Sequence, residues 1–163
     1  MPTNIRRRGR GIPKVAPAEI ADGALDTTGV DVLTGVADHV YVAHRITFHY
    51  PTDITAIDMD IKFDTIDEEG TQRDYATIAD DGDITEIKAI INTWIDPNAP
   101  TNTVLCYKEF EKPLALEEGD TISIVGNDAT DANNYTSTGG VSTFVTIDYE
   151  DIDANVYEQA NWA

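Results

Sequence analysis

The sequence has one cysteine, no long apolar run and few basic residues. Cys106 is the only cysteine among 163 residues, so an intramolecular disulfide is excluded and nothing indicates an oxidising compartment. No apolar run approaches the roughly 20 residues that a membrane-spanning helix needs. Arg7-Arg8 resembles a twin-arginine signal, but no apolar segment follows it. We therefore expect neither a membrane anchor nor secretion by a standard signal.

Basic residues are scarce and gathered at one end. The chain has 11 Lys and Arg against 30 Asp and Glu, a formal net charge of −19. Five of the eleven lie in the first fourteen residues, where there is no acid. From Val15 onward, six basic residues face thirty acidic ones, a formal charge of −24. Such a body repels nucleic acid and anionic membranes. The five residues of the basic segment are Arg6, Arg7, Arg8, Arg10 and Lys14.

Two explanations of the acidic body compete. In molar salt, screening over a few ångströms removes the repulsion between carboxylates, which then keep the surface hydrated. Alternatively, the protein is an acidic mesophilic one that binds cations or a basic partner. The scarcity of Lys, with five against thirty acids, favours adaptation to high salt.

Signals for catalysis are absent. The sequence has no phosphate-binding glycine loop, no Gly-x-Ser-x-Gly motif, and a lone cysteine inside a strand-like run. Three histidines, His39, His44 and His49, are five positions apart. In a regular strand that spacing places His44 on the face opposite the other two and prevents a shared metal. We expect no enzymatic activity and no cofactor.

Two groups of polar residues are candidate binding sites. The cluster Asp80-Asp81-Gly82-Asp83 reads as a turn and is a weak candidate for structural Mg²⁺ or Ca²⁺, although its spacing is not that of an EF-hand. Residues 126–140 are polar and read as a long surface loop, where binding functions concentrate. The candidate binding residues of this loop are Asn127, Asp128, Asp131, Asn133, Asn134 and Tyr135.

Period-two alternation predicts an all-β fold. It is clearest in residues 39–50 and 56–63, and weaker in 30–36, 75–78, 103–110 and 141–149. Residues 110–125 read as strand, turn and strand, with Gly119 free to take a positive φ. Residues 84–95 fit either a strand or a helix, because Asp83 and Glu86 form a capping box. Seven or eight short strands predict an antiparallel two-sheet sandwich.

The domain organisation follows from these patterns. Residues 1–20 contain three prolines and the basic run, which predicts a flexible N-terminal arm. Residues 21–150 would form the sandwich. Residues 151–163 would form a C-terminal tail, and its Tyr157 and Trp162 are aromatic residues of the kind that dock near a terminus. An arm with four arginines and no acid would attract an acidic protein surface or a phosphate backbone.

Three stretches carry a resemblance to a known family. Residues 40–42 (VYV), 110–114 (FEKPL) and 116–122 (LEEGDTI) resemble the small jelly-roll domains that tailed viruses use as virion structural proteins, including capsid decoration (cement) proteins. The resemblance covers residues 38–150. It implies a jelly-roll fold, a flexible arm that reaches across neighbouring subunits, and a trimer seated on a capsid lattice. The acidic body would place such a virus on a haloarchaeal host.

The resemblance implies a virion structural protein, assembled in the host cytoplasm, that binds capsid or other virion proteins through its basic arm. The long loop at 126–140 departs from small cement proteins and leaves room for a receptor-facing role. The alternative is a surface adhesion or carbohydrate-binding β-sandwich of a halophile. Oligomeric state distinguishes the two, because an adhesion domain would be a monomer.

Overall fold

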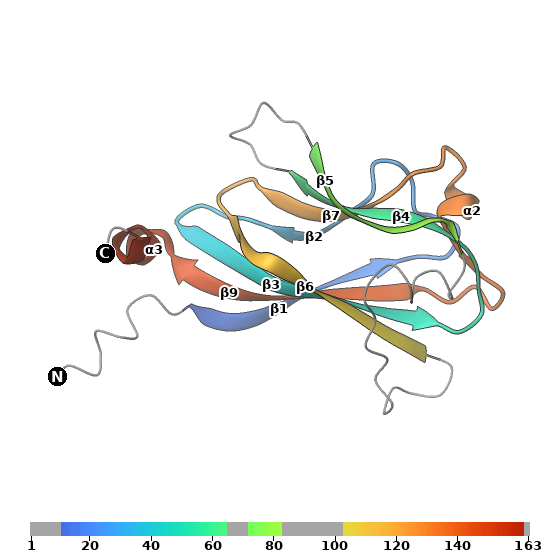
Figure 1. Cartoon of the computed structure of the whole chain (residues 1–163), viewed down its shortest axis with the longest axis horizontal. Coiled ribbons are helices and arrows are strands. Elements are labelled where there is room, and N and C mark those ends of the chain that lie inside the picture. Colours follow the sequence, from blue (N-terminus) through green and yellow to red (C-terminus); the bar gives the residue numbers. More distant parts are fainter. Residues whose placement is uncertain (1–10, 65–71, 83–102, 162–163) are drawn as a thin grey trace.

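The computed structural model describes residues 11–64, 72–82 and 103–161, which form two β-sheets packed face to face (Figure 1). One sheet has the strand order β1-β9-β3-β6 and the other the order β2-β7-β4-β5, with the short β8 paired to β4. The helices α2 and α3 lie at opposite ends of the sandwich. The strands are β1 (Ile12–Ile20), β2 (Val30–Thr34), β3 (His39–Pro51), β4 (Ile54–Asp64), β5 (Gln72–Gly82), β6 (Thr103–Leu116), β7 (Thr121–Gly126), β8 (Tyr135–Ser137) and β9 (Thr143–Asp153), and the helices are α2 (Asp131–Asn134) and α3 (Ala154–Asn161).

The antiparallel strand pairs are nested within one another. β4 pairs with β5, β3 with β6, β2 with β7, and β1 with β9. The chain is therefore one long double-stranded ribbon, rolled up so that successive pairs fall alternately in the two sheets. Eight strands rolled in this way form a jelly roll. The predicted antiparallel two-sheet, jelly-roll-like sandwich is confirmed.

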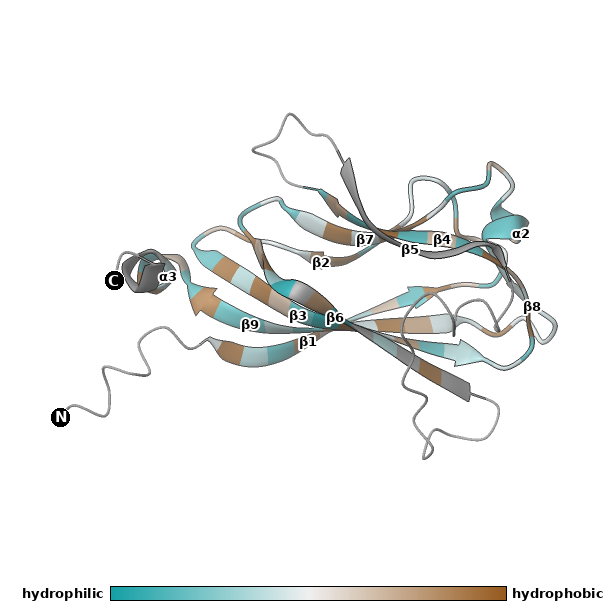
Figure 2. Ribbon diagram, viewed as in Figure 1, coloured by the Kyte–Doolittle hydropathy of each residue, from teal (hydrophilic) through white to brown (hydrophobic). Residues whose placement is uncertain are grey.

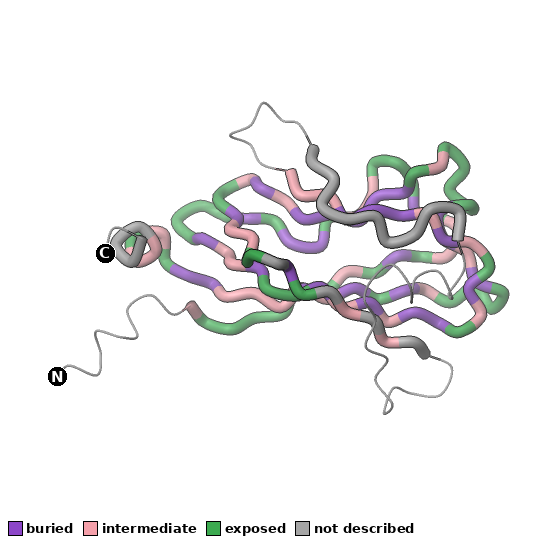
Figure 3. The backbone as a smooth tube through the Cα atoms, viewed as in Figure 1, coloured by how far each residue is buried: buried purple, intermediate pink, exposed green. Residues whose placement is uncertain are grey.

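The hydrophobic core lies between the sheets and takes one face of each strand. On β3, Ile46, Phe48 and Tyr50 are fully buried, whereas Thr47 and His49 between them are partly exposed. Along β9, Val145 and Ile147 are buried and the residues on either side of them are at least partly exposed, whereas β7 is buried at five consecutive positions (Figures 2 and 3). The strands predicted over residues 39–50 and 56–63 are confirmed, although a bulge between Ala43 and Arg45 interrupts the predicted alternation of β3.

Residues 110–125 do not form a hairpin. β6 ends at Leu116 and β7 begins at Thr121, but β6 lies in one sheet and β7 in the other. The turn between them crosses the sandwich. Gly119 has a φ of 86°, as the glycine prediction required, and its N–H donates to the carbonyl of Gly35. The strand–turn–strand assignment was correct, but period two does not reveal which sheet a strand joins.

The predicted flexible arm extended too far into the chain. Ile12–Ile20 is the edge strand β1, paired along its whole length with β9. Ala16 and Ala18 pack against the core and Ile20 is buried. Prolines at 13 and 17 are compatible with this position because an edge strand needs only half of its N–H groups for pairing.

The C-terminal boundary was also misplaced. β9 continues to Asp153, and α3 follows it at once. Ile152 is buried opposite Val40 of β3. The sandwich therefore runs from Ile12 to Asp153, wider than the predicted 21–150, and the expected tail begins with three strand residues and a helix. Trp162 lies outside the described residues.

Two further assignments change. β5 runs from Gln72 to Gly82, so Asp80, Asp81 and Gly82 belong to a strand and not to the predicted turn. Residues 126–140 are not one irregular loop, because they contain α2 and β8. The ambiguous segment 84–95 lies outside the described residues, and its two alternatives stay open.

Candidate functional site

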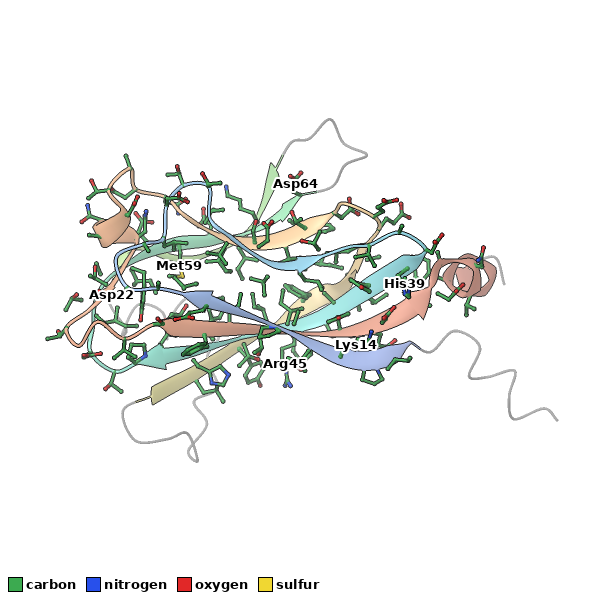
Figure 4. All side chains as sticks on the ribbon, turned by 180° about the vertical axis from the view of Figure 1, so that it is seen from behind. Lys14, Asp22, His39, Arg45, Met59 and Asp64 are labelled. Atoms are coloured by element: carbon green, nitrogen blue, oxygen red, sulfur yellow. The ribbon has the colours of Figure 1, made fainter. Side chains whose placement is uncertain are left out.

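Three polar side chains meet at the end of the sandwich where β1 begins. Asp151 of β9 is 8% exposed and lies between Lys14 of β1 and His39 of β3. The Lys14 Nζ is 2.5 Å from Asp151 Oδ2, and the His39 Nδ1 is 2.6 Å from Oδ1. We call these three residues the anchor cluster. Figure 4 shows Lys14 and His39 near α3, at the end opposite Asp22.

Strand register explains why the anchor cluster forms. Ile12 and Tyr41 are the Cα partners of Asp151 on its two sides. Lys14 is two positions after Ile12 and His39 is two positions before Tyr41, so all three side chains point to the inner face of the sheet. At this open end of the sandwich the inner face meets water, and a charged group can be placed there.

The contacts within the anchor cluster shift the pKa values of Asp151 and Lys14. Burial alone would raise the pKa of Asp151, but the hydrogen bonds from Lys14 and His39 outweigh it and hold that pKa below its ordinary value. The hydrogen bond to Asp151 correspondingly raises the pKa of Lys14. The cluster thus favours its charged form, in which an ammonium and an imidazole share one carboxylate. This is an electrostatic fastening of β1 onto β9 and β3.

Two tyrosines line the inner side of this cluster. The Tyr41 and Tyr149 rings are 4.8 Å apart and tilted by 54°, and the His39 ring lies 6.2 Å from that of Tyr41. Burial, with a smaller contribution from Tyr41, raises the pKa of Tyr149. Both rings pack against the hydrophobic core beside the charged cluster. We assign the cluster a fastening role.

Lys14 is therefore misassigned as a residue of a free binding arm. Its ammonium is occupied by Asp151 within the same chain, and β1 holds its backbone. The other four residues of the predicted arm, Arg6, Arg7, Arg8 and Arg10, lie outside the described residues. Gly11 connects them to β1, and a side chain there would overlap the backbone and side chains of β9.

A bulge in β3 changes the predicted placement of the histidines. The register of β3 against both neighbours shifts between Ala43 and Arg45. The extra residue is His44, which lies 3.6 Å from Glu150 on the outer face. His49 also faces outward, whereas His39 faces inward. The prediction that His44 lies opposite the other two is wrong, because a bulge reverses the alternation after it.

Two residues of the predicted binding loop are structural. Asn134 and Tyr135 are fully buried. The Asn134 amide donates to the carbonyls of Leu25 and Asp128 at 2.9 and 2.8 Å, and its Oδ1 accepts the Asp128 N–H at 2.7 Å. The Tyr135 hydroxyl donates to the carbonyl of Val141 at 2.6 Å. Their assignment to an exposed loop is wrong, because local polarity does not report a buried hydrogen-bond network.

The remaining predicted loop residues, Asn127, Asp131 and Asn133, are exposed, and Asp128 is half-buried. Asp128 Oδ1 accepts the N–H of Thr130 at 2.7 Å, and this hydrogen bond lowers the pKa of Asp128. Binding to a partner by these four residues stays a prediction.

Other acids at this end of the sandwich serve the backbone as Asp128 does. Asp22 accepts the N–H of Ser137 at 2.6 Å, and Asp53 accepts the N–H of Gly139 at 2.8 Å. Asp26 accepts from both Thr28 and Gly29. These carboxylates close turns, which is the common use of Asp in loops.

Metal binding by the predicted acidic cluster stays untested. Asp80 and Asp81 lie in β5, and Asp83 is outside the described residues. Within residues 11–64, 72–82 and 103–161, no group of three or more His, Cys, Asp or Glu side chains is arranged to hold a metal ion. No helix in these ranges is long and apolar enough to cross a membrane.

Comparisons with known proteins add little to this geometry. No protein-family model matches the chain, and no curated protein matches it. Among solved structures, a chain described as "Structure of infectious bursal disease virus Gx strain" aligns at 13% identity with a TM-score of 0.20. The alignment covers 93% of this chain and 43% of that chain. A score this low does not indicate a shared fold, so function is argued from the chain itself.

Proposed function

We propose that the chain is a non-enzymatic virion structural protein that decorates a capsid lattice and binds it through its basic N-terminal segment. The observation that carries the proposal is the junction at Gly11. The segment with four arginines is followed by Gly11, and the next residue begins β1. This edge strand is paired along its whole length with β9 of an acidic sandwich. The proposal rests also on the resemblance of residues 38–150 to jelly-roll decoration proteins.

The separation of charge favours a protein partner with an acidic surface. The arginines are followed by a body of formal charge −24, and Lys14, the last basic residue of the segment, is occupied by Asp151. Arginine forms bidentate hydrogen bonds with carboxylates. In molar salt the Debye length is about 3 Å, so only ion pairs in direct contact contribute. Contact pairs between arginine and carboxylate meet that requirement.

The anchor cluster supports the same role. A tether transmits force to the fold at the residue where it leaves the fold, and here that residue is the start of β1. Lys14 and Asp151 bind β1 to β9 next to that point, with His39 adding β3. The fastening would keep the edge strand in place when the preceding segment is held by a partner.

Deletion of residues 1–10 tests the proposal, and the structure sets that boundary, because a longer deletion would remove β1 residues. Incorporation into particles, measured by quantitative mass spectrometry of purified virions, is expected to fall at least tenfold. A full-length variant in which Arg6, Arg7, Arg8 and Arg10 are all changed to Ser should show the same loss of incorporation as the deletion. Circular dichroism and the thermal midpoint should not change in either variant.

A matched control separates the arginines from the anchor cluster. Lys14→Met keeps the arm but removes the ammonium from Asp151. It should lower the thermal midpoint and leave binding to particles unchanged at temperatures where the variant is folded. Full incorporation of the chain without residues 1–10 would contradict the proposed role of the arm.

A further inference from the structure

Exposed apolar side chains concentrate on one two-stranded edge of the sandwich. In the described part of the chain, five large apolar residues are conspicuously exposed. Ile12 and Val15 belong to β1, Phe144 to β9, and Val141 lies two residues before β9. The fifth, Val36, is in the turn between β2 and β3. Val15 and Phe144, at 57% and 50% exposed, lie on the outer face of the β1-β9-β3-β6 sheet.

Three cross-strand rows make up the middle of that outer face. Each row takes one residue from β1, β9, β3 and β6 in turn, because the register of the three strand pairs is continuous there. The middle row carries no charge. The rows are Val15-Asp148-Arg45-Glu109, Pro17-Thr146-Thr47-Tyr107 and Glu19-Phe144-His49-Leu105. We call these twelve residues the outer patch.

The outer patch is poor in unpaired charge. Arg45 donates from Nε to Asp148 Oδ2 at 2.9 Å, and its guanidinium lies 5.4 Å from the centre of the Tyr107 ring. Figure 4 shows Arg45 pointing away from the other sheet. Two bodies of charge −24 can approach closely only through a surface on which carboxylates are few or paired.

The edge beside the outer patch is closed to strand addition. Pro13 and Pro17 are two positions either side of Val15. Because neither proline has an N–H to donate to β9, the backbone hydrogen bonds from β1 to β9 are made by the alternate residues. The backbone groups of residues 13, 15, 17 and 19 therefore point to the open edge, and two of these four residues have no N–H. Prolines on an edge prevent another strand from joining the sheet. A partner at this location would pack on the face of the sheet.

We propose that the outer patch is an interface with a second copy of this chain, related by a two-fold axis that runs parallel to the strands between β9 and β3. Such an axis places β9 over β3 and β1 over β6 of the second copy, with every row opposite the same row. Packed sheets in proteins keep their strands aligned within about 30° and lie about 10 Å apart.

The rows are self-complementary under this operation. Arg45 faces Asp148 of the second copy, so the two intrachain ion pairs become a four-membered network. Phe144 faces His49, and Pro17 faces Tyr107. The two carboxylates at the rim of the patch meet apolar side chains and not each other, because Glu19 faces Leu105 and Glu109 faces Val15. An isologous interface requires this reciprocal match.

The inference goes beyond the proposed function, because the dimer would form with or without a virion. It also differs from the trimer that the family resemblance implies. A two-fold contact between outer patches leaves the start of β1 at the rim of the interface. Failure of the dimer would not affect the arm-deletion experiment, and failure of the arm would not affect the dimer.

The first test is the mass of the full chain in molar KCl, measured by light scattering after size exclusion. We expect a dimer that becomes a monomer in Phe144→Asp. Val36→Asp is the matched control, because Val36 is similarly exposed but lies off the patch, and it should remain a dimer. Circular dichroism checks that each variant folds. A native monomer, a trimer, or a dimer that survives Phe144→Asp would overturn the proposal.

The second test locates the axis. Chains carrying Val15→Cys and Glu109→Cys, each in a Cys106→Ser background, are mixed and treated with a short bis-maleimide, since sheets about 10 Å apart are too distant for a disulfide. Both residues are exposed, so neither change should disturb the fold. We expect cross-links in the mixture and few with the Val15→Cys chain alone. Equal cross-linking in both would overturn the proposed axis.

Discussion

Lys14 and Asp151 are 137 positions apart in the chain, and the ammonium of the first lies 2.5 Å from a carboxylate oxygen of the second. The pair joins the first strand of the jelly roll to the last. Nested pairing places β1 beside β9, so this ion pair links the first and last strands of the chain. His39 contacts the same carboxylate and links β3 to them. This ion pair therefore lies close to the point where the arginine-rich segment ends and β1 begins.

This relationship predicts a specific pH dependence. The folded-state pKa of Asp151 is lowered, so its ionised form contributes stability above the unfolded-state value of about 3.9, and the contribution is lost as the pH falls through the folded pKa. The free energy of unfolding of the native chain minus that of Asp151→Asn should therefore shrink as the pH falls below about 4. Urea denaturation at fixed salt measures it. A difference that stays constant down to pH 2 would be evidence against this assignment.

The stability contributed by the Lys14–Asp151 ion pair is also lost at high pH. The pKa of Lys14 is raised, so its contribution is complete below the unfolded value of about 10.4 and is lost as the pH rises through the folded pKa. The difference between the native chain and Lys14→Met should therefore disappear only in strongly alkaline solution.

Gly35 is expected to be essential for the crossing between the sheets. A Cβ there would overlap the carbonyl oxygen of Glu117, and the Gly35 N–H donates to Asp120 at 2.8 Å. Gly35→Ala should lower the free energy of unfolding by about 2 kcal/mol or more, since the backbone must move. Gly23→Ala is the control: it has a φ of 67° and open space around it, and should cost about 1 kcal/mol. An equal loss of unfolding free energy in the two variants would show that the turn at Gly35 tolerates a side chain.

Asn134 is expected to contribute far more to stability than its exposed neighbour. Asn134→Ala removes three hydrogen bonds within a buried site, and it should cost about 2 to 4 kcal/mol. Asn133→Ala, at an exposed position, should stay within about 0.5 kcal/mol of the native chain. Denaturant titration of both variants measures the difference. Similar values for the two would indicate that the segment is not ordered by this amide.

Adaptation to high salt predicts that folding depends on ionic strength. With a body of formal charge −24, the midpoint of thermal unfolding should rise steadily as KCl is increased from dilute buffer toward several molar, because screening weakens the repulsion between carboxylates. Circular dichroism at each salt concentration measures it. Full stability in dilute buffer without divalent ions would favour the mesophilic explanation.

The alternation of apolar and polar residues predicted those features of the fold that depend on residues near one another in the chain. The alternation in β3 and β4 identified both strands because half-buried strands alternate by necessity. The count of strands and turns then led to a two-sheet sandwich, and Gly119 was correctly assigned a positive φ. β1 was missed because its prolines and exposed residues read as an arm, and only pairing with β9 makes it a strand.

By itself, the sequence determined the strand-rich architecture and the separation of a basic segment from an acidic body, since both are properties of residues near one another in the chain. Only the tertiary structure decided that His39, Lys14 and Asp151 meet, that the turn before Thr121 crosses between sheets, and that Asn134 is buried. The physical reason is register: which residues face each other across strands depends on pairings, and on a single-residue bulge at His44, that no local periodicity specifies.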